Sequence, residues 1–238
     1  MKNFKLLPVY IILATLAPCD TQDVQKAIKT VSTNVKSNTL TNDEIIRGLK
    51  EALKVGTNNS VAKASKLDGF YKNAQIKIPW PADAAAMETK LRQLGMGAQV
   101  DKVTETLNRG AEEAAKTAAS IFLDAITKLT ISDGMNILKG ADNAATTFLK
   151  NNTTTQLRTS FKPTVHNALT KVEITKYWNP LATTYNQIPL VTKVNPDLDA
   201  YVTEKAIEGL FKLIADEEYK IRKDPAARIT DILKRVFG

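Results

Sequence analysis

The sequence predicts an all-α protein, an irregular bundle of several helices with one long central helix. Apolar residues recur at spacings of three and four along most of the chain, which is the helical period. The chain carries no alternating run of apolar and polar residues, the pattern of a half-buried strand, and no repeat of fixed period. With 238 residues, 43% of them hydrophobic and 24% charged, the composition is that of a globular protein that buries a core.

The N-terminal residues are typical of an export signal. Two lysines precede residues 6–17, an apolar stretch of signal-peptide length that is too short to span a bilayer well. The next residues, Leu16-Ala17-Pro18-Cys19, resemble the lipobox of bacterial lipoproteins, in which a leucine lies three residues before a cysteine that becomes lipidated. Pro18 departs from that pattern, because a small residue usually precedes the cysteine. We expect lipidation at Cys19, and plain secretion or an uncleaved anchor are the alternatives.

These features divide the chain into three parts. We expect residues 1–19 to be a signal peptide with a lipobox-like end, residues 20–40 a polar tether or a loose first helix, and residues 41–238 a single helical domain. A lipid on Cys19 would tether the protein to a membrane by its N-terminus. The expected location is therefore the cell envelope, membrane-anchored and facing the periplasm or the surface.

The first part of the domain is expected to hold two short helices and an extended segment. Thr41-Asn42-Asp43-Glu44 is a capping box that begins a helix, and we expect this helix to end at Gly56. A second helix is expected near residues 60–66. Residues 76–81 cannot be helical, because two prolines bracket Trp80. We predict that this segment is extended and places the tryptophan in the structure.

The middle of the domain is expected to contain the longest helix. A helix over residues 81–94 leads to a segment whose apolar positions recur at helical spacing over residues 98–129. We predict that this second segment is the long central helix, because its alanine-rich middle allows other helices to approach closely. Two shorter helices are expected over residues 132–138 and 142–150.

The last part of the domain is expected to be interrupted at several points. Residues 151–153 are predicted to be a linker, after which a helix resumes and Pro163 kinks or restarts it. Asp197 or Asp199 is expected to cap a strong helix, and Pro225 to begin the last one.

Composition excludes several kinds of site. The chain has one cysteine, Cys19, and one histidine, His166, so an intrachain disulfide and a zinc site of Cys and His ligands cannot form. The Glu-x-x-His pairs of metal sites in helical bundles are missing as well, and we predict no metal and no cofactor. The formal net charge of +8 is spread over helices of mixed sign. It predicts a solvated surface and no nucleic-acid partner.

Several segments resemble one protein family when they are taken together. They are Gly48-Leu49-Lys50-Glu51-Ala52-Leu53, Asp68-Gly69-Phe70, Ile78-Pro79, Leu94-Gly95-Met96-Gly97, Val100-Asp101, Asn108-Arg109, Tyr201-Val202-Thr203, Gly209-Leu210-Phe211, Ile214-Ala215, Glu217-Glu218, Ile221-Arg222-Lys223-Asp224-Pro225 and Val236-Phe237-Gly238. The set resembles, over about residues 41–238, the bacterial family catalogued as domain of unknown function 4197. Gly110 departs from it, since we would expect alanine there. The resemblance implies a helical, exported and often lipoprotein-like protein, without an established activity or catalytic residues.

Four residues that precede the last long helix are candidates for binding a ligand. Asn108 and Arg109 lie beside the apolar face of the predicted long helix, where polar side chains are able to line a pocket. A ladder of ion pairs along the helix is the alternative for Arg109. Trp80 and Trp178 are able to line an apolar cavity, and the alternative is that they anchor the core.

Three further candidates belong to the densest polar cluster, which lies on the last long helix. Glu217, Glu218 and Arg222 are able to bind a polar group if they face a cleft. The alternative is an ion pair between Glu218 and Arg222, which are four residues apart and therefore neighbours on a helix.

Three functions are compatible with these residues. The preferred one is a membrane-tethered, non-enzymatic binding or scaffolding protein for an apolar or lipid-like ligand or for a protein partner of the envelope. The alternative is a hydrolase-like enzyme, or a metal site with oxygen ligands, that uses the carboxylates between Glu204 and Asp224. Nucleic-acid binding is disfavoured because the chain carries an export signal and no basic run.

Overall fold

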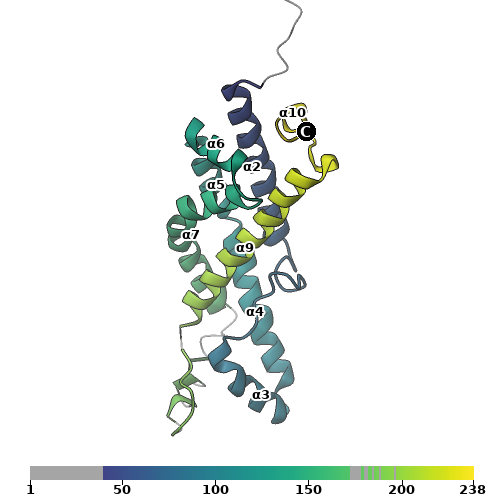
Figure 1. Cartoon of the computed structure of the whole chain (residues 1–238). Coiled ribbons are helices and arrows are strands. Elements are labelled where there is room, and N and C mark those ends of the chain that lie inside the picture. The colour runs from purple at the N-terminus through teal and green to yellow at the C-terminus, as the bar shows by residue number, and fades with distance from the viewer. Residues whose placement is uncertain (1–39, 172–177, 180–181, 184, 188, 196) are drawn as a thin grey trace, which may run out of the picture. The chain divides into compact units, whose positions relative to one another are not determined.

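Residues 40–238 form one compact unit, separate from Met1–Thr39. The computed structural model in Figure 1 describes residues 40–171, 178–179, 182–183, 185–187, 189–195 and 197–238. The predicted signal peptide, Cys19 and the tether up to residue 39 lie outside the described residues. The described residues form helices and no strand, which confirms the all-α prediction. None of the described helices is both long enough and apolar enough to span a bilayer.

A long helix lies at the centre of this unit, but it is not the segment that the sequence predicts. The central helix is α9, which packs against α7, α2 and α4 and crosses the other helices in Figure 1. The elements in chain order are α2 (Asn42–Ser65), η1 (Ala82–Ala84), α3 (Ala85–Gln93), α4 (Gly97–Ala115), α5 (Ala118–Thr127), α6 (Ile131–Lys139), α7 (Ala144–Lys171), α9 (Leu198–Lys223), η2 (Pro225–Ala227) and α10 (Asp231–Phe237).

The prediction of a single helix over residues 98–129 is wrong. The chain forms α4 and α5 there, and the break lies at Lys116 and Thr117. Both amide N–H groups donate to carbonyls three residues back rather than four, which tightens the turn. The hydroxyl of Thr117 also donates to the carbonyl of Ala114 at 2.9 Å. The apolar spacing continues across this break, so periodicity alone could not locate it.

Helix α2 runs through Gly56, where the sequence predicts an end, and includes the helix expected over residues 60–66. Gly56 is buried, and a Cβ atom placed on it would lie 3.5 Å from the Cβ of Glu217 on α9. The glycine therefore lies where α2 and α9 approach each other closely. The hydroxyl of Ser60 donates to the carbonyl of Gly56 at 2.7 Å, as is usual inside a continuous helix.

Helix α7 replaces two predicted helices and the linker between them. Residues 151–153 stay helical because their apolar neighbours, including Leu149, Leu157 and Phe161, form one buried face at four-residue spacing. The side chains of Asn152 and Thr153 donate to carbonyls four residues back, which satisfies them within the helix. Pro163 is exposed, so the carbonyl that its missing N–H leaves unpaired is on the solvent side.

Capping was the most accurate local prediction, with one exception at the C-terminus. The hydroxyl of Thr41 accepts the N–H of Glu44, whose carboxylate accepts the N–H of Thr41, so the capping box is confirmed. Asp197 accepts the N–H of Ala200 and caps α9. Pro225, however, begins only the short η2. The last α-helix starts six residues later, behind the N-cap Thr230.

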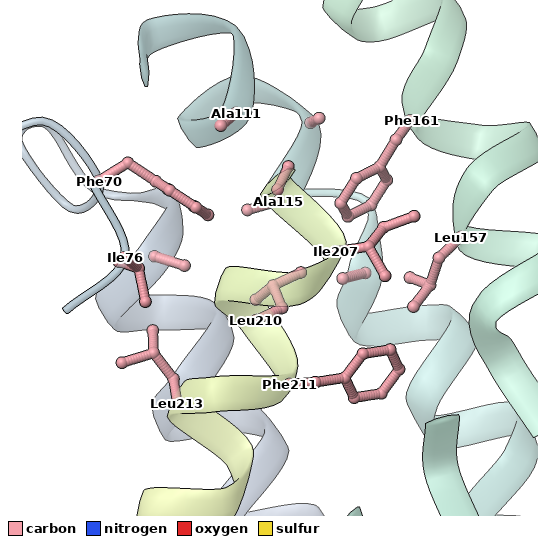
Figure 2. Packing of buried hydrophobic residues seen from close by; sticks show 14 of the residues in the cluster. Phe70, Ile76, Ala111, Ala115, Leu157, Phe161, Ile207, Leu210, Phe211 and Leu213 are labelled. Atoms are coloured by element: carbon pink, nitrogen blue, oxygen red, sulfur yellow. The ribbon is translucent and has the colours of Figure 1, made fainter. Parts of the chain in front are cut away.

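The core lies around α9 (Figure 2). Ile207 and Phe211 point toward Leu157 and Phe161 of α7, and the ring of Phe211 also meets that of Phe122 edge to face, with centroids 5.9 Å apart. On the other side of α9, Phe70 and Ile76 of the segment after α2 complete the packing. Burying such rings is the main stabilising contribution of a bundle of this size.

Replacing glycine by alanine should have opposite effects on stability at two positions of this core, Gly209 and Gly110. A Cβ atom on Gly209 would lie 2.7 Å from the ring of Phe70, so Gly209→Ala should lower the free energy of unfolding by about 1–3 kcal/mol. On Gly110 it would lie 3.6 Å from Leu169, an ordinary contact. Gly110→Ala should therefore raise that free energy by about 0.5–1 kcal/mol through helix propensity. Urea unfolding of both variants checks the pair, and a destabilised Gly110→Ala would contradict the packing described.

Candidate functional site

Asn108 is completely buried and holds the extended segment that the sequence predicts around residue 78. Its amide oxygen accepts the N–H of Ile78 at 2.8 Å, and its amide nitrogen donates to the carbonyl of Ile78 at 2.9 Å and to that of Thr104 at 2.7 Å. One side chain thus satisfies both backbone groups of a buried residue that has no strand partner. The structure gives Asn108 a role within the fold and leaves it no free polar atom for a ligand.

Arg109 and Glu112 hold the preceding part of the same segment. Glu112 is buried, and one of its oxygens accepts the N–H groups of Phe70 and Tyr71, both at 3.1 Å. Its other oxygen accepts Arg109 at 2.7 Å, and Arg109 also donates to Asp68 at 2.8 Å. Lys72 and Arg109 together lower the pKa of Asp68. The ladder of ion pairs predicted for Arg109 along the helix is present in part, since Arg109 pairs with Glu105 at 3.3 Å but Glu113 pairs with Lys116. The contacts of Arg109 and Glu112 fix the segment after α2 to α4.

The two candidate tryptophans lie in contact. Their rings meet edge to face with centroids 5.2 Å apart and an interplanar angle of 74°. Trp80 donates its indole N–H to the hydroxyl of Thr104 at 3.1 Å. Both side chains are almost fully buried, at 6% and 1% exposure, and belong to the main core cluster. The structure therefore places them as anchors of the core.

Glu218 and Arg222 form the predicted ion pair, but the pair is buried and has a further use. One oxygen of Glu218 accepts Arg222 at 2.9 Å and the N–H of Ala145 at 2.9 Å. The other accepts the N–H of Thr146 at 2.8 Å and its hydroxyl at 2.7 Å. Ala145 and Thr146 are the second and third residues of α7, in the first turn, where amides have no partner inside the helix. Glu218 on α9 therefore caps α7 from outside, where its charge is also favourable for the helix dipole.

A small cavity lies beside this pair. It has a volume of about 30 Å³, room for about two water molecules, and its walls are mostly apolar side chains. The penultimate residue, Phe237, is part of its lining. The cavity is too small for a lipid-like ligand, and the oxygens of Glu218 that face it are already occupied by α7 and Arg222.

The other carboxylates of the polar cluster are paired at the surface. Glu217 accepts Asn59 at 3.0 Å and Lys220 at 2.6 Å. Burial raises the pKa of Glu217, but these hydrogen bonds outweigh it and leave the pKa lowered. Glu204 pairs with Arg158, and Asp216 pairs with Lys212. Within the described ranges, no three residues of His, Cys, Asp or Glu gather as a metal site would require.

A larger hollow lies on the surface between α5 and α10, along the outer face of α2. We call it the α2/α5/α10 groove, and it has a volume of about 720 Å³. Figure 1 shows α2 lying between α5 and α10 at this end of the bundle. The lining consists of Arg47, Lys50, Glu51 and Lys54 of α2, Leu123, Ile126 and Thr127 of α5, and Thr230, Asp231, Ile232 and Arg235 from the α10 region.

The groove combines positive charge with an apolar side. Four basic and two acidic residues line it, an excess of two positive charges. Arg47 and Lys54 are exposed and form no ion pair with any residue in the described part of the chain. On the α5 side, Leu123 is 48% exposed and adds apolar surface to the groove. An arrangement of free cations beside an apolar surface suits a molecule that has both an anionic group and an apolar part.

The other two basic residues of the groove are held in place by contacts at its edges. Lys50 donates to the carbonyl of Thr127 at the end of α5, at 2.9 Å. Arg235 pairs with Glu44 at 2.7 Å and so joins α10 to α2. The Thr41 backbone N–H and Arg235 lower the pKa of Glu44 to about 2, so this pair stays charged across the physiological range.

A second surface groove, lined by residues of α7 and α9, differs in that its charged side chains are paired except for Lys162, which has no ion pair among the described residues. It has a volume of about 570 Å³ and includes Arg158, His166 and Asp199. Arg158 pairs with Glu204, and His166 lies 2.6 Å from Asp199. A histidine and a carboxylate without a nucleophile aligned to them do not make a catalytic site. The α2/α5/α10 groove is therefore the better candidate.

Sequence reasoning did not find the α2/α5/α10 groove. One signal was available, because Arg47, Lys50 and Lys54 follow one another at three- and four-residue spacing on a single face of α2. A charged face opposite an apolar face is ordinary for a surface helix. What makes this one distinct is that α5 and α10 flank it, and that depends on tertiary packing.

Comparison with curated proteins and with solved structures gives no match. One family model matches the chain over residues 39–238, which is the whole of the described unit, and its description is "Protein of unknown function (DUF4197)". The segments quoted from the sequence all lie within this match. The chain therefore belongs to the DUF4197 family.

Proposed function

We propose that the chain is a membrane-tethered, non-enzymatic binding protein. Its ligand is an amphiphile with an anionic head and an apolar portion, held in the α2/α5/α10 groove. The observation that carries the proposal is that Arg47 and Lys54, which form no ion pair within the described part of the chain, lie beside the exposed Leu123 in one hollow. The lipobox-like end of the N-terminal segment supports the tether.

The enzymatic alternative has less support. The carboxylates expected to do acid–base work already accept hydrogen bonds from lysine, arginine, asparagine or the start of α7. A general base needs a lone pair within reach of the substrate, and a metal site needs several free oxygens. At the α2/α5/α10 groove, Arg47, Lys54 and Glu51 have no ion pair among the described residues, and the four basic residues of the lining outnumber its two acidic ones, which favours binding an anion.

Titration with laurate, a carboxylate on a twelve-carbon chain, tests the proposal. We use residues 20–238, the predicted mature chain without its lipidated cysteine, at laurate concentrations below micelle formation. Isothermal titration calorimetry should show saturable binding, and Arg47→Glu with Lys54→Glu should weaken it at least about tenfold, since two attractive contacts become repulsive. Higher salt should weaken it too, because exposed charges are screened.

A matched double variant separates the groove from net charge. Lys90→Glu with Lys150→Glu changes the net charge by the same amount on α3 and α7, and both lysines are exposed and outside the groove lining. It should bind laurate as the parent chain does. Decyl maltoside, an uncharged amphiphile, should bind more weakly than laurate. Equal affinity of both double variants for laurate would mean that the groove is not the site.

A further inference from the structure

The α2/α5/α10 groove lies at the end of the unit where the chain enters it. Helix α2 begins at Asn42, and the first basic residue of the groove, Arg47, is within two turns of that start. Between Cys19 and Leu40 the chain has 20 residues, which span at most about 70 Å when fully extended. A lipid on Cys19 therefore keeps this end of α2 within reach of the bilayer surface.

We infer that the α2/α5/α10 groove is the face by which the folded unit lies on a membrane rich in anionic phospholipids. The inference rests on the proposed function, because it identifies the anionic amphiphile as a phospholipid within the bilayer. It thus names both the source of the ligand and the orientation of the protein on the membrane.

Charge complementarity is the first argument. Arg47, Lys50 and Lys54 follow one another along one face of α2, and Arg235 adds a fourth basic group from α10. Lys54 and Arg47 form no ion pair with a carboxylate among the described residues. Glu51 and Asp231 also line the groove, so phosphate groups would meet an excess of two positive charges. Each basic residue near an anionic bilayer strengthens binding by about fivefold, and the effect falls off within a Debye length.

The apolar side of the groove is the second argument. Leu123 is 48% exposed on α5, and Ile232 is half-buried on α10, so aliphatic side chains lie on both flanks of the basic row. At a membrane surface, apolar side chains enter the boundary between headgroups and acyl chains while lysine and arginine stay at the phosphates. The second surface groove lacks this combination, since no leucine or isoleucine lines it, and its arginine and histidine are paired with Glu204 and Asp199.

Vesicle sedimentation tests the inference with the chain of residues 20–238. Vesicles of phosphatidylcholine with about one third phosphatidylglycerol, an ordinary anionic content, should bind the chain, and pure phosphatidylcholine should not. Arg47→Glu with Lys54→Glu should reduce the partition coefficient at least about 30-fold, since two favourable contacts are lost. The matched variant Lys90→Glu with Lys150→Glu should change it by no more than about threefold. Equal losses in the two double variants, or equal binding to both kinds of vesicle, would overturn the inference.

Reporter positions on the lipidated full chain give the orientation directly. With Cys19 blocked by its lipid, a cysteine introduced by Glu51→Cys in the groove is the only free thiol, and an environment-sensitive fluorophore can be attached there. Its emission should shift to the blue on anionic vesicles, whereas the same dye attached through Lys90→Cys on α3 should not respond. A response at position 90 and none at position 51 would overturn the inference.

The laurate and vesicle experiments separate the two proposals. If laurate binds in the groove and anionic vesicles do not, the groove holds a soluble ligand and the membrane inference fails alone. If vesicles bind through the groove and laurate does not, the membrane face is supported and the groove is not a site for free amphiphiles. If neither binds, both proposals fail.

Discussion

Glu218→Ala should lower the free energy of unfolding by about 3–5 kcal/mol, the largest effect that we expect from a single substitution in this protein. The change leaves Arg222, whose side chain is only 11% exposed, without its carboxylate partner. It also leaves the N–H groups of Ala145 and Thr146 without an acceptor at the start of α7. Urea unfolding followed by far-ultraviolet circular dichroism measures the loss.

The neighbouring residue supplies the control. Glu217 pairs with Lys220 and Asn59 at the surface, so Glu217→Ala should cost no more than about 1 kcal/mol. Glu218→Gln should fall between the two, because it keeps one oxygen acceptor and loses the charge. If Glu217→Ala and Glu218→Ala cost the same, the buried cap of α7 does not form as described.

The second large effect is expected at Asn108. Asn108→Leu keeps the approximate size of the side chain but leaves the buried N–H and C=O groups of Ile78 unpaired. Each unpaired buried group costs about 1–3 kcal/mol, so we expect a loss of about 2–4 kcal/mol in the free energy of unfolding. Hydrogen exchange provides a local measurement, since the amide of Ile78 should lose its protection before the helices do.

Asn73 lies in the same segment and is a useful comparison. Its amide oxygen accepts only the N–H of Gln75, at 3.2 Å and in an exposed place. Asn73→Ala should therefore change the free energy of unfolding by less than about 1 kcal/mol and leave the exchange of Ile78 unaltered. A stable Asn108→Leu variant with a protected Ile78 amide would show that the side chain is not what holds the segment.

The parts of the fold that depend on local chemistry could be predicted from the sequence. The capping box at Thr41 and the aspartate cap of α9 need only residues within three positions of each other, and both are present. Helix ends that depend on neighbouring helices could not be predicted. Gly56 continues α2, where it lies against α9, and residues 151–153 continue α7 because their face is buried.

The contrast between local and tertiary contacts also explains which features of the candidate site could be predicted from the sequence. The Glu218–Arg222 pair follows from a spacing of four on one helix, and it is present. That the same carboxylate caps α7 depends on residues more than seventy positions apart, so no local pattern indicates it. The α2/α5/α10 groove likewise brings three distant segments together, and only the basic face of α2 was visible beforehand.

The cap that α9 provides for α7 also bears on how the chain is made. The ribosome completes α7 well before it reaches Glu218. During synthesis, the N–H groups in the first turn of α7 therefore lack the carboxylate that accepts their hydrogen bonds in the folded protein. The end of α6 also lacks a contact until α9 has been made, because Arg222 of α9 donates to the carbonyl of Ile137 at 2.8 Å. In chains that end before α9, the apolar face of α7 that α9 covers in the full protein stays exposed. Proteases of the cell recognise such incompletely folded chains.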